Sequence, residues 1–192
     1  MSRRPAVGVV YNPFLDTLYT GIRGQGSFLT RNASLPSAAG GEKLRLPLSG
    51  NPPPLGDLST CLVAVEWGSQ RDGPNFEIKA RAFRKLTASR ENGGSMVHSL
   101  RSLGSAALNL CACAAGQVDL YWEGGCYAWD VTAGWCILEE AGGRMVGGNP
   151  GDWETGLDSR LYLAVRGASS GQEAVVKEFW EVLGEDKMVY QH

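Results

Sequence analysis

The chain has 192 residues, of which 43% are hydrophobic and 20% are charged, and its formal net charge is −2. This length suits one ordinary domain with a sizeable buried core. The slightly negative charge excludes a surface built to bind nucleic acid or anionic lipid, and no apolar run approaches the roughly 20 residues of a membrane span. We expect a cytoplasmic chain that binds neither nucleic acid nor membranes.

Three strand-like runs open the chain, at residues 6–12, 16–22 and 24–30. The glycines around the second turn resemble a phosphate-binding loop only superficially, because no Lys-Ser/Thr pair follows them, and we interpret them as turn residues. Residues 34–59 are rich in Pro, Gly and Ser and predict a surface loop, in which "KLRLPL" is the one candidate for a short strand.

Strands and helices alternate in the rest of the chain, which predicts a mixed α/β fold. The helix predicted at residues 74–88 opens with a proline and places Phe76, Ala80 and Phe83 on one apolar stripe. We find no internal repeat and no second domain boundary, so residues 1–192 are expected to form a single domain. The other predicted elements are strands at 61–67, 118–123, 144–149 and 161–167, an extended run at 94–104, and helices at 105–116, after Asp130, and at 172–183.

The sequence favours neither a zinc site nor a histidine-based catalytic site. We interpret the cysteines, which form no paired CxxC units, as small buried hydrophobic residues in a reducing compartment. His98 lies in an alternating run and is interpreted as a strand residue rather than a catalytic base. The five cysteines are Cys61, Cys111, Cys113, Cys126 and Cys136.

Asp130 stands between Trp129 and an apolar pattern of helical spacing that ends at Gly142 and Gly143. Asp is a favoured N-cap residue, because its side-chain oxygen accepts a hydrogen bond from a free amide of the first turn. On this segment alone a helix cap is the more common role, and a metal ligand is the rarer one.

Two further features are predicted to lie close to Asp130. Gly104, Ser105 and Ala106 form a strand-to-helix junction, where free amides either attract oxygen-rich ligands or simply receive a helix cap. Glu123 ends a predicted strand, and a short Gly-Gly turn brings its carboxylate and that of Asp130 to one rim of a sheet. A solvated strand-end Glu is the alternative, although ligand sites in α/β sheets lie at the carboxyl ends of strands.

Residues 104–143 strongly resemble the C-terminal signature region of the inositol monophosphatase family, in which Trp-Asp, two residues and Ala-Gly precede Glu-Ala-Gly-Gly. Trp129, Asp130, Ala133, Gly134 and residues 140–143 fit this pattern. The run "GVVYNPFLDTLYTGIRGQGSFLTRN" resembles the hairpin that follows the central metal motif of that family. The resemblance implies a layered α/β sandwich of the inositol monophosphatase and sugar phosphatase type.

Carried over residue by residue, the resemblance makes Asp130 a ligand of an active-site Mg²⁺ that also contacts a substrate hydroxyl. It makes Glu123 the acid that hydrogen-bonds the sugar-alcohol ring, and it makes Gly104, Ser105 and Ala106 the helix-start segment that contacts the same ring. The implied reaction is hydrolysis of a small-molecule phosphate monoester by a metal-activated water, in an enzyme that is a homodimer when complete.

Two family motifs that supply most metal carboxylates, an upstream Glu-Glu pair and Asp-Pro-x-Asp-Gly-Thr, precede the hairpin in the family and are not found before it in this sequence. One Asp is a poor site for Mg²⁺, so no catalytic residue is identified in this chain. We expect an N-terminally truncated version of the fold, equivalent to its C-terminal two-thirds, in which the strand at residues 6–12 has an exposed edge.

Three functions stay open. The first is a magnesium-dependent phosphatase of inositol monophosphate or a related sugar-alcohol phosphate, inactive or weakly active as this chain alone. The second is a non-catalytic remnant that pairs with a complete homologue or binds a ligand weakly. The third is the same enzyme class acting on a nucleotide bisphosphate, fructose bisphosphate or a quinate-pathway compound. Glu123 favours inositol phosphates.

Overall fold

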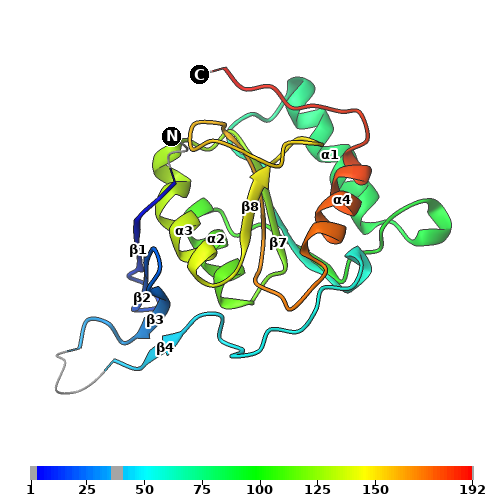
Figure 1. Cartoon of the computed structure of the whole chain (residues 1–192). Helices are drawn as coiled ribbons and strands as arrows, with labels where there is room; N and C mark the ends of the chain where they lie inside the picture. The colour runs from blue at the N-terminus through cyan, green and yellow to red at the C-terminus, as the bar shows by residue number, and fades with distance from the viewer. Residues whose placement is uncertain (1–3, 36–40, 192) are drawn as a thin grey trace.

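The computed structural model describes residues 4–35 and 41–191, in which two β-sheets alternate with two layers of helices (Figure 1). The strands are β1 (Val7–Asn12), β2 (Thr17–Ile22), β3 (Gly26–Arg31), β4 (Lys43–Arg45), β5 (Leu62–Val65), β6 (Ser99–Arg101), β7 (Leu120–Gly124), β8 (Arg144–Gly147) and β9 (Leu161–Val165). The helices are α1 (Gly73–Thr87), α2 (Ala106–Ala115), α3 (Ala128–Glu140) and α4 (Gln172–Leu183), with short 3₁₀ turns at Leu58–Thr60 and Arg90–Asn92.

The four-stranded sheet is antiparallel, in the order β1-β2-β3-β4, and the five-stranded sheet has the order β6-β5-β7-β9-β8. In the second sheet β5 is parallel to both β6 and β7, whereas β9 runs antiparallel to β7 and β8. Helices α2 and α3 lie between the two sheets, and α1 and α4 cover the far face of the five-stranded sheet (Figure 1). The predicted layered α/β sandwich is confirmed.

Two buried clusters of apolar side chains flank the five-stranded sheet. One lies around α2 and α3 and includes Leu110, Ile137 and Leu138, and the other lies under α1 and α4 and includes Leu86 and Phe179. Burial of both faces explains why the strands of the five-stranded sheet read as continuous apolar runs.

Within residues 4–35 and 41–191 no helix is long and apolar enough to cross a bilayer.

The first hairpin packs its backbone directly against α3. A Cβ on Gly8 would lie 2.1 Å from the carbonyl oxygen of Ala133, and a Cβ on Gly21 would lie 3.0 Å from Cα of Ile137. Only glycine permits this approach of strand to helix. Strand β1 ends the sheet as predicted, and the side chains of Val7 and Val9 on its outer face are 59% and 58% exposed.

The apolar stripe predicted for α1 was wrong. Phe76 is only half-buried and Phe83 is exposed, because both rings pack against Trp67 at the protein surface rather than in the core. The buried face of α1 instead carries Ile78, Ala82 and Leu86, together with Lys79 and Asn75. The helix has two possible stripes, and packing of the long aliphatic chains against α4 decides between them.

The segment at residues 34–59 is only partly a surface loop. It contains the short strand β4, as predicted, and residues 36–40 lie outside the described part of the chain. Leu46, Leu55 and Leu58 are buried, however, so the segment is anchored to both clusters of the core. Its Pro and Gly content predicted irregular backbone correctly but did not reveal these three anchors.

All five cysteines are free and buried, which confirms that they are buried residues. His98 was wrongly interpreted as a strand residue: β6 begins at Ser99, and the His98 side chain is exposed while its backbone N–H donates to the carbonyl of Cys61 at 3.0 Å. Helix α4 occupies the predicted residues, and the predicted helix after Asp130 ends before Gly142 and Gly143.

Candidate functional site

The carboxyl ends of the three parallel strands β6, β5 and β7 meet at one edge of the five-stranded sheet. The loops that follow these strands enclose a cavity of about 520 Å³ with the first turns of α2 and α3. All five residues singled out in the sequence lie on its wall. The lining residues are Gly68, Ser69, Gly104, Ser105, Ala106, Ala107, Glu123, Gly125, Cys126, Tyr127, Trp129 and Asp130.

Gly104, Ser105 and Ala106 lead into α2. Gly104 has a φ of +82°, a conformation that favours glycine, and Ser105 is the N-cap, whose hydroxyl accepts the N–H of Leu108 at 3.3 Å. The cap expected for this segment is therefore present. Capping leaves other amides of the first helical turn without intrahelical partners, and Ala106 and Ala107 line the cavity at this helix end.

Glu66 holds this segment in place and was missed in the sequence. Its Oε1 atom accepts hydrogen bonds from the N–H of Leu103 at 2.6 Å, the N–H of Gly104 at 2.8 Å and Nδ2 of Asn109 at 2.9 Å. The residue is 7% exposed. The sequence did indicate Glu66, because this residue directly follows an apolar strand. Ligand sites in α/β sheets lie at the carboxyl ends of strands, which applies to Glu66 as it does to Glu123.

Glu123 lies near the end of β7 and is 9% exposed. Its Oε2 atom accepts a hydrogen bond from the hydroxyl of Tyr121, which also lies 3.7 Å from Sγ of Cys126. Burial raises the pKa of the Glu123 carboxyl above its ordinary value, while the hydrogen bond from Tyr121 opposes that rise. Glu123 is thus a buried acceptor on the wall of the cavity, not a solvated strand end.

Asp130 is not the N-cap of α3, in contrast to the sequence interpretation. The cap is Tyr127, and Asp130 is the third residue of the helix, where its Oδ2 atom accepts the N–H of Tyr127 at 2.8 Å. This is the reciprocal half of a capping box, in which an acid at the third position satisfies the cap amide. The side chain is half-buried and lines the cavity, so the helix contact and a ligand contact are compatible.

Arg160 fixes the turn between Glu123 and Asp130. Its backbone carbonyl accepts the N–H of Gly125 at 2.8 Å, its Nη2 atom donates to the carbonyl of Gly125 at 2.9 Å, and its guanidinium lies 4.1 Å from the ring centre of Tyr127. Tyr127 in turn stacks on Trp129, whose side chain is 76% exposed. No local pattern in the sequence indicated this contact, because Arg160 comes from the loop before β9.

A second cavity of about 490 Å³ continues from the first and shares Gly68, Gly104, Ala106 and Glu123 with it. Glu66 and Arg71 complete its charged lining. Together the two cavities hold three carboxylates and several backbone N–H and C=O groups. This surface suits the part of a ligand that is rich in hydroxyl groups, because each hydroxyl both donates and accepts hydrogen bonds.

The described residues do not fit a magnesium site. They contain no group of three or more Asp, Glu, His or Cys side chains that could hold a metal. Glu66 and Glu123 each use a carboxylate oxygen for protein hydrogen bonds, and Asp130 uses one for the helix cap. Mg²⁺ takes several oxygen ligands in octahedral geometry, which Asp130 alone does not supply.

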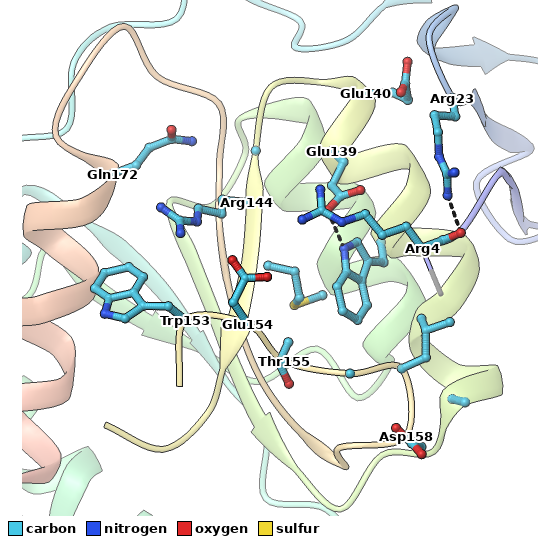
Figure 2. A pocket seen from close by; sticks show the side chains of 16 residues that line it. Arg4, Arg23, Glu139, Glu140, Arg144, Trp153, Glu154, Thr155, Asp158 and Gln172 are labelled. Carbon is cyan, nitrogen blue, oxygen red and sulfur yellow. Dashed lines mark hydrogen bonds between the residues drawn. The ribbon is translucent and has the colours of Figure 1, made fainter. Parts of the chain in front are cut away.

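A larger cavity, about 1320 Å³, lies elsewhere, between α3, β8 and the loop before β9 (Figure 2). Acidic and basic side chains mix around it, and several are already engaged: Arg23 donates to the carbonyl of Pro5 at 3.1 Å, and Glu140 accepts the N–H of Gly26 at 2.7 Å. None of the five residues singled out in the sequence lines it. The Glu140 contact ties the start of β3 to α3.

Fold and site together define a layered α/β protein with a polar ligand cavity at the carboxyl ends of parallel strands. The chain belongs to the inositol monophosphatase family, whose model matches residues 2–183. Over 188 residues it is 45% identical to inositol monophosphatase 2 of Saccharomyces cerevisiae, covering 95% of this chain and 58% of that protein. It is 40% identical to quinic acid degradation cluster protein x of Neurospora crassa, covering 92% and 55%.

Among solved structures, inositol monophosphatase from Anabaena matches with a TM-score of 0.67 and 29% identity, covering 96% of this chain and 60% of that one. The chain therefore spans less than two thirds of the length of these relatives. The structural match and the family match together confirm the fold type expected from the sequence.

Proposed function

We propose that this chain carries the ring-binding side of a phosphatase site for inositol monophosphate or a related sugar-alcohol phosphate. The observation that carries the proposal is the meeting of Gly104, Ser105, Ala106, Glu123 and Asp130 on one cavity wall. These residues come from three different segments: the junction that leads into α2, the end of β7 and the first turn of α3. The family resemblance assigns all five to contacts with the sugar-alcohol ring, and the relative in Saccharomyces cerevisiae is named an inositol monophosphatase.

The chemistry of the wall supports a polyol ligand. The Glu123 carboxylate accepts hydrogen bonds from ring hydroxyls, and the N–H groups at the start of α2 donate to hydroxyl oxygens. Asp130 offers a further acceptor at the same cavity. A polyol ring satisfies all these groups, whereas an apolar ring leaves buried acceptors without partners at a cost of about 1 to 3 kcal/mol each.

The proposal assigns no step of phosphate hydrolysis to the described residues, since they do not fit a magnesium site. Asp130 is the one carboxylate proposed to contribute to binding of Mg²⁺, and further ligands are required for it to do so. We therefore expect the 192-residue chain to release phosphate from inositol monophosphate far below an ordinary enzymatic rate of about 1 to 10³ per second. Cytoplasmic location and assembly as a homodimer belong to the same proposal.

Calorimetric titration of the chain with three ligands tests ring recognition. Myo-inositol 1-phosphate and myo-inositol should both bind, because the proposed contacts are to the ring. Inorganic phosphate should not bind at the same concentrations. Binding of phosphate alone, with none of myo-inositol, would refute the proposal. Phosphate release at an ordinary rate would refute the expectation of low activity but not ring recognition.

A second candidate ligand is a carboxylated polyol ring, favoured by the 40% identity to the protein named for quinic acid degradation. Such a ring offers the same hydroxyl groups and carries a carboxylate instead of a phosphate. Quinate titrated in parallel with myo-inositol distinguishes the two candidates, and tighter binding of quinate would favour the second.

A further inference from the structure

Lys79 is an unusual residue for the buried face of a helix. It lies on α1 and is 1% exposed, and lysine is almost never fully buried without a partner. Its Nζ atom donates to the carbonyl oxygen of Trp67 at 3.0 Å and to that of Gly124 at 2.9 Å. Neither the sequence patterns nor the proposed ring contacts assign Lys79 a role.

One carbonyl group belongs to the loop after β5 and the other to the last residue of β7, and these two strands are neighbours in the sheet. Trp67 precedes Gly68 and Ser69 in the loop after β5, and Gly124 follows Glu123 at the end of β7. The ammonium lies directly behind Gly68, since a Cβ on that glycine would lie 3.5 Å from Nζ of Lys79. Lys79 therefore joins the loop after β5 to the end of β7, on the side of these segments that faces α1.

The ammonium also lies among acidic groups. Burial lowers the pKa of Lys79, and the charge of Glu123 opposes this most strongly. In the other direction, burial raises the pKa of Glu123, hydrogen bonds with Tyr121 and Cys126 oppose the rise most strongly, and the charge of Lys79 opposes it to a smaller extent. The other charged or titratable groups around this pair are Glu66, Arg71, Tyr121, Cys126 and Tyr190.

We infer that Lys79 is a positioning residue of the proposed polyol site. Its ammonium holds the loop after β5 and the end of β7 together at the cavity wall. Its charge also balances the Glu123 carboxylate, so that this carboxylate stays an acceptor for ligand hydroxyls. The inference rests on the proposed function for the identity of the ligand. The tie between these two segments and the charge balance are properties of the ligand-free protein. They can be tested without any ligand.

The main test compares Lys79→Met with Lys85→Met. Lys85 is the matched control, because it lies on the same helix and its Nζ atom also donates to a carbonyl, that of Val182 at 3.0 Å, away from the cavity. In ligand-free protein labelled with ¹³C-glutamate, Lys79→Met should move the titration midpoint of Glu123 upward, and Lys85→Met should leave it unchanged. An unchanged midpoint in Lys79→Met would overturn the inference.

Titration with myo-inositol supplies a second measurement. Lys79→Met should weaken binding near neutral pH by at least about fivefold, and higher pH should restore part of the loss because it ionises Glu123. Lys85→Met should retain the parent affinity. A loss of affinity that is equal in both variants, or equal at all pH values, would reduce Lys79 to a purely structural residue.

Two further outcomes are distinguishable. If Lys79→Met does not fold, Glu123→Gln decides the matter: the inference predicts a lower pKa for the Lys79 ammonium in that variant than in the parent, and an equal pKa overturns it. If the parent protein does not bind myo-inositol, the proposed function fails. The Glu123 midpoint in Lys79→Met then still decides the charge balance by itself.

Discussion

The carboxylate of Glu66 and the backbone N–H of Gly104 form a 2.8 Å hydrogen bond that joins the end of β5 to the segment before α2. The same carboxylate oxygen accepts two further N–H groups, from Leu103 and Asn109. One buried acid thus fixes the left-handed backbone at Gly104 and the first turn of a helix. The ring contacts proposed for this segment depend on that arrangement.

Replacing Glu66 with Ala should destabilise the protein by about 3 kcal/mol, because three N–H donors, of which that of Asn109 is buried, lose a charged acceptor. It should also weaken binding of myo-inositol by at least about tenfold, since the segment at Gly104 is no longer held. Urea denaturation and calorimetric titration measure the two effects. Glu91→Ala, on an exposed 3₁₀ turn, is the control and should change neither. Parent-like affinity in Glu66→Ala would contradict the assigned role.

Substitutions of Asp130 should separate its two contacts. Asp130→Asn keeps an oxygen that accepts the N–H of Tyr127, so the free energy of unfolding should change by less than about 0.5 kcal/mol, whereas Asp130→Ala should cost about 1 kcal/mol. Asp130→Asn should nevertheless weaken binding of myo-inositol 1-phosphate by about five- to tenfold, because a charged acceptor becomes neutral. Equal affinities of parent and Asp130→Asn would leave Asp130 with its helix role alone.

The elements could be predicted from the sequence wherever local chemistry decides them. Helix α4 has a single clear apolar stripe, and the glycine pair after Ala141 stops α3, so α4 and the end of α3 were predicted well. The face of α1 was not, because Phe76 and Phe83 form a competing stripe that ends up against Trp67.

The candidate site could be predicted only in part, because contacts between distant parts of the sequence place some of its residues. Glu123 and Asp130 were indicated by family motifs and by the tendency of ligand sites in α/β sheets to lie at the carboxyl ends of strands. The fold brings both residues to one cavity. Glu66, Lys79 and Arg160 act through hydrogen bonds that span 35 to 45 residues of sequence, and no local pattern encodes such contacts. These three residues contact the segments that form the cavity wall, and they belong to no sequence motif.

The raised pKa of Glu123 predicts how stability depends on pH. The folded protein holds the Glu123 proton more tightly than the unfolded chain does, so the contribution of this residue is lost as pH rises from its ordinary pKa of 4.5 through the folded pKa. Glu123→Gln has no such proton. Over this range the free energy of unfolding of the parent should therefore fall relative to that of Glu123→Gln, as measured by urea denaturation at several pH values. Parallel pH profiles would contradict the pKa shift.

The open face of the four-stranded sheet predicts binding of a hydrophobic dye. Val7, Val9, Tyr11 and Ile22 are all at least 43% exposed, and pairing of Val7 with Ile22 places them on one surface. The double variant Val7→Thr, Val9→Thr keeps β-branched side chains in β1 and should reduce both dye fluorescence and self-association in sedimentation experiments. A parent protein that is monomeric and binds no dye would contradict this prediction.

Titration of the chain with myo-inositol 1-phosphate, with and without Mg²⁺, tests the central claim most directly. The claim is that the described residues bind the sugar-alcohol ring but do not make a magnesium site. We predict saturable binding in both titrations, with affinities that agree within about twofold, because the ring contacts need no metal. No binding in either titration would contradict the ring site, and binding that appears only with Mg²⁺ would contradict the conclusion that these residues do not fit the metal.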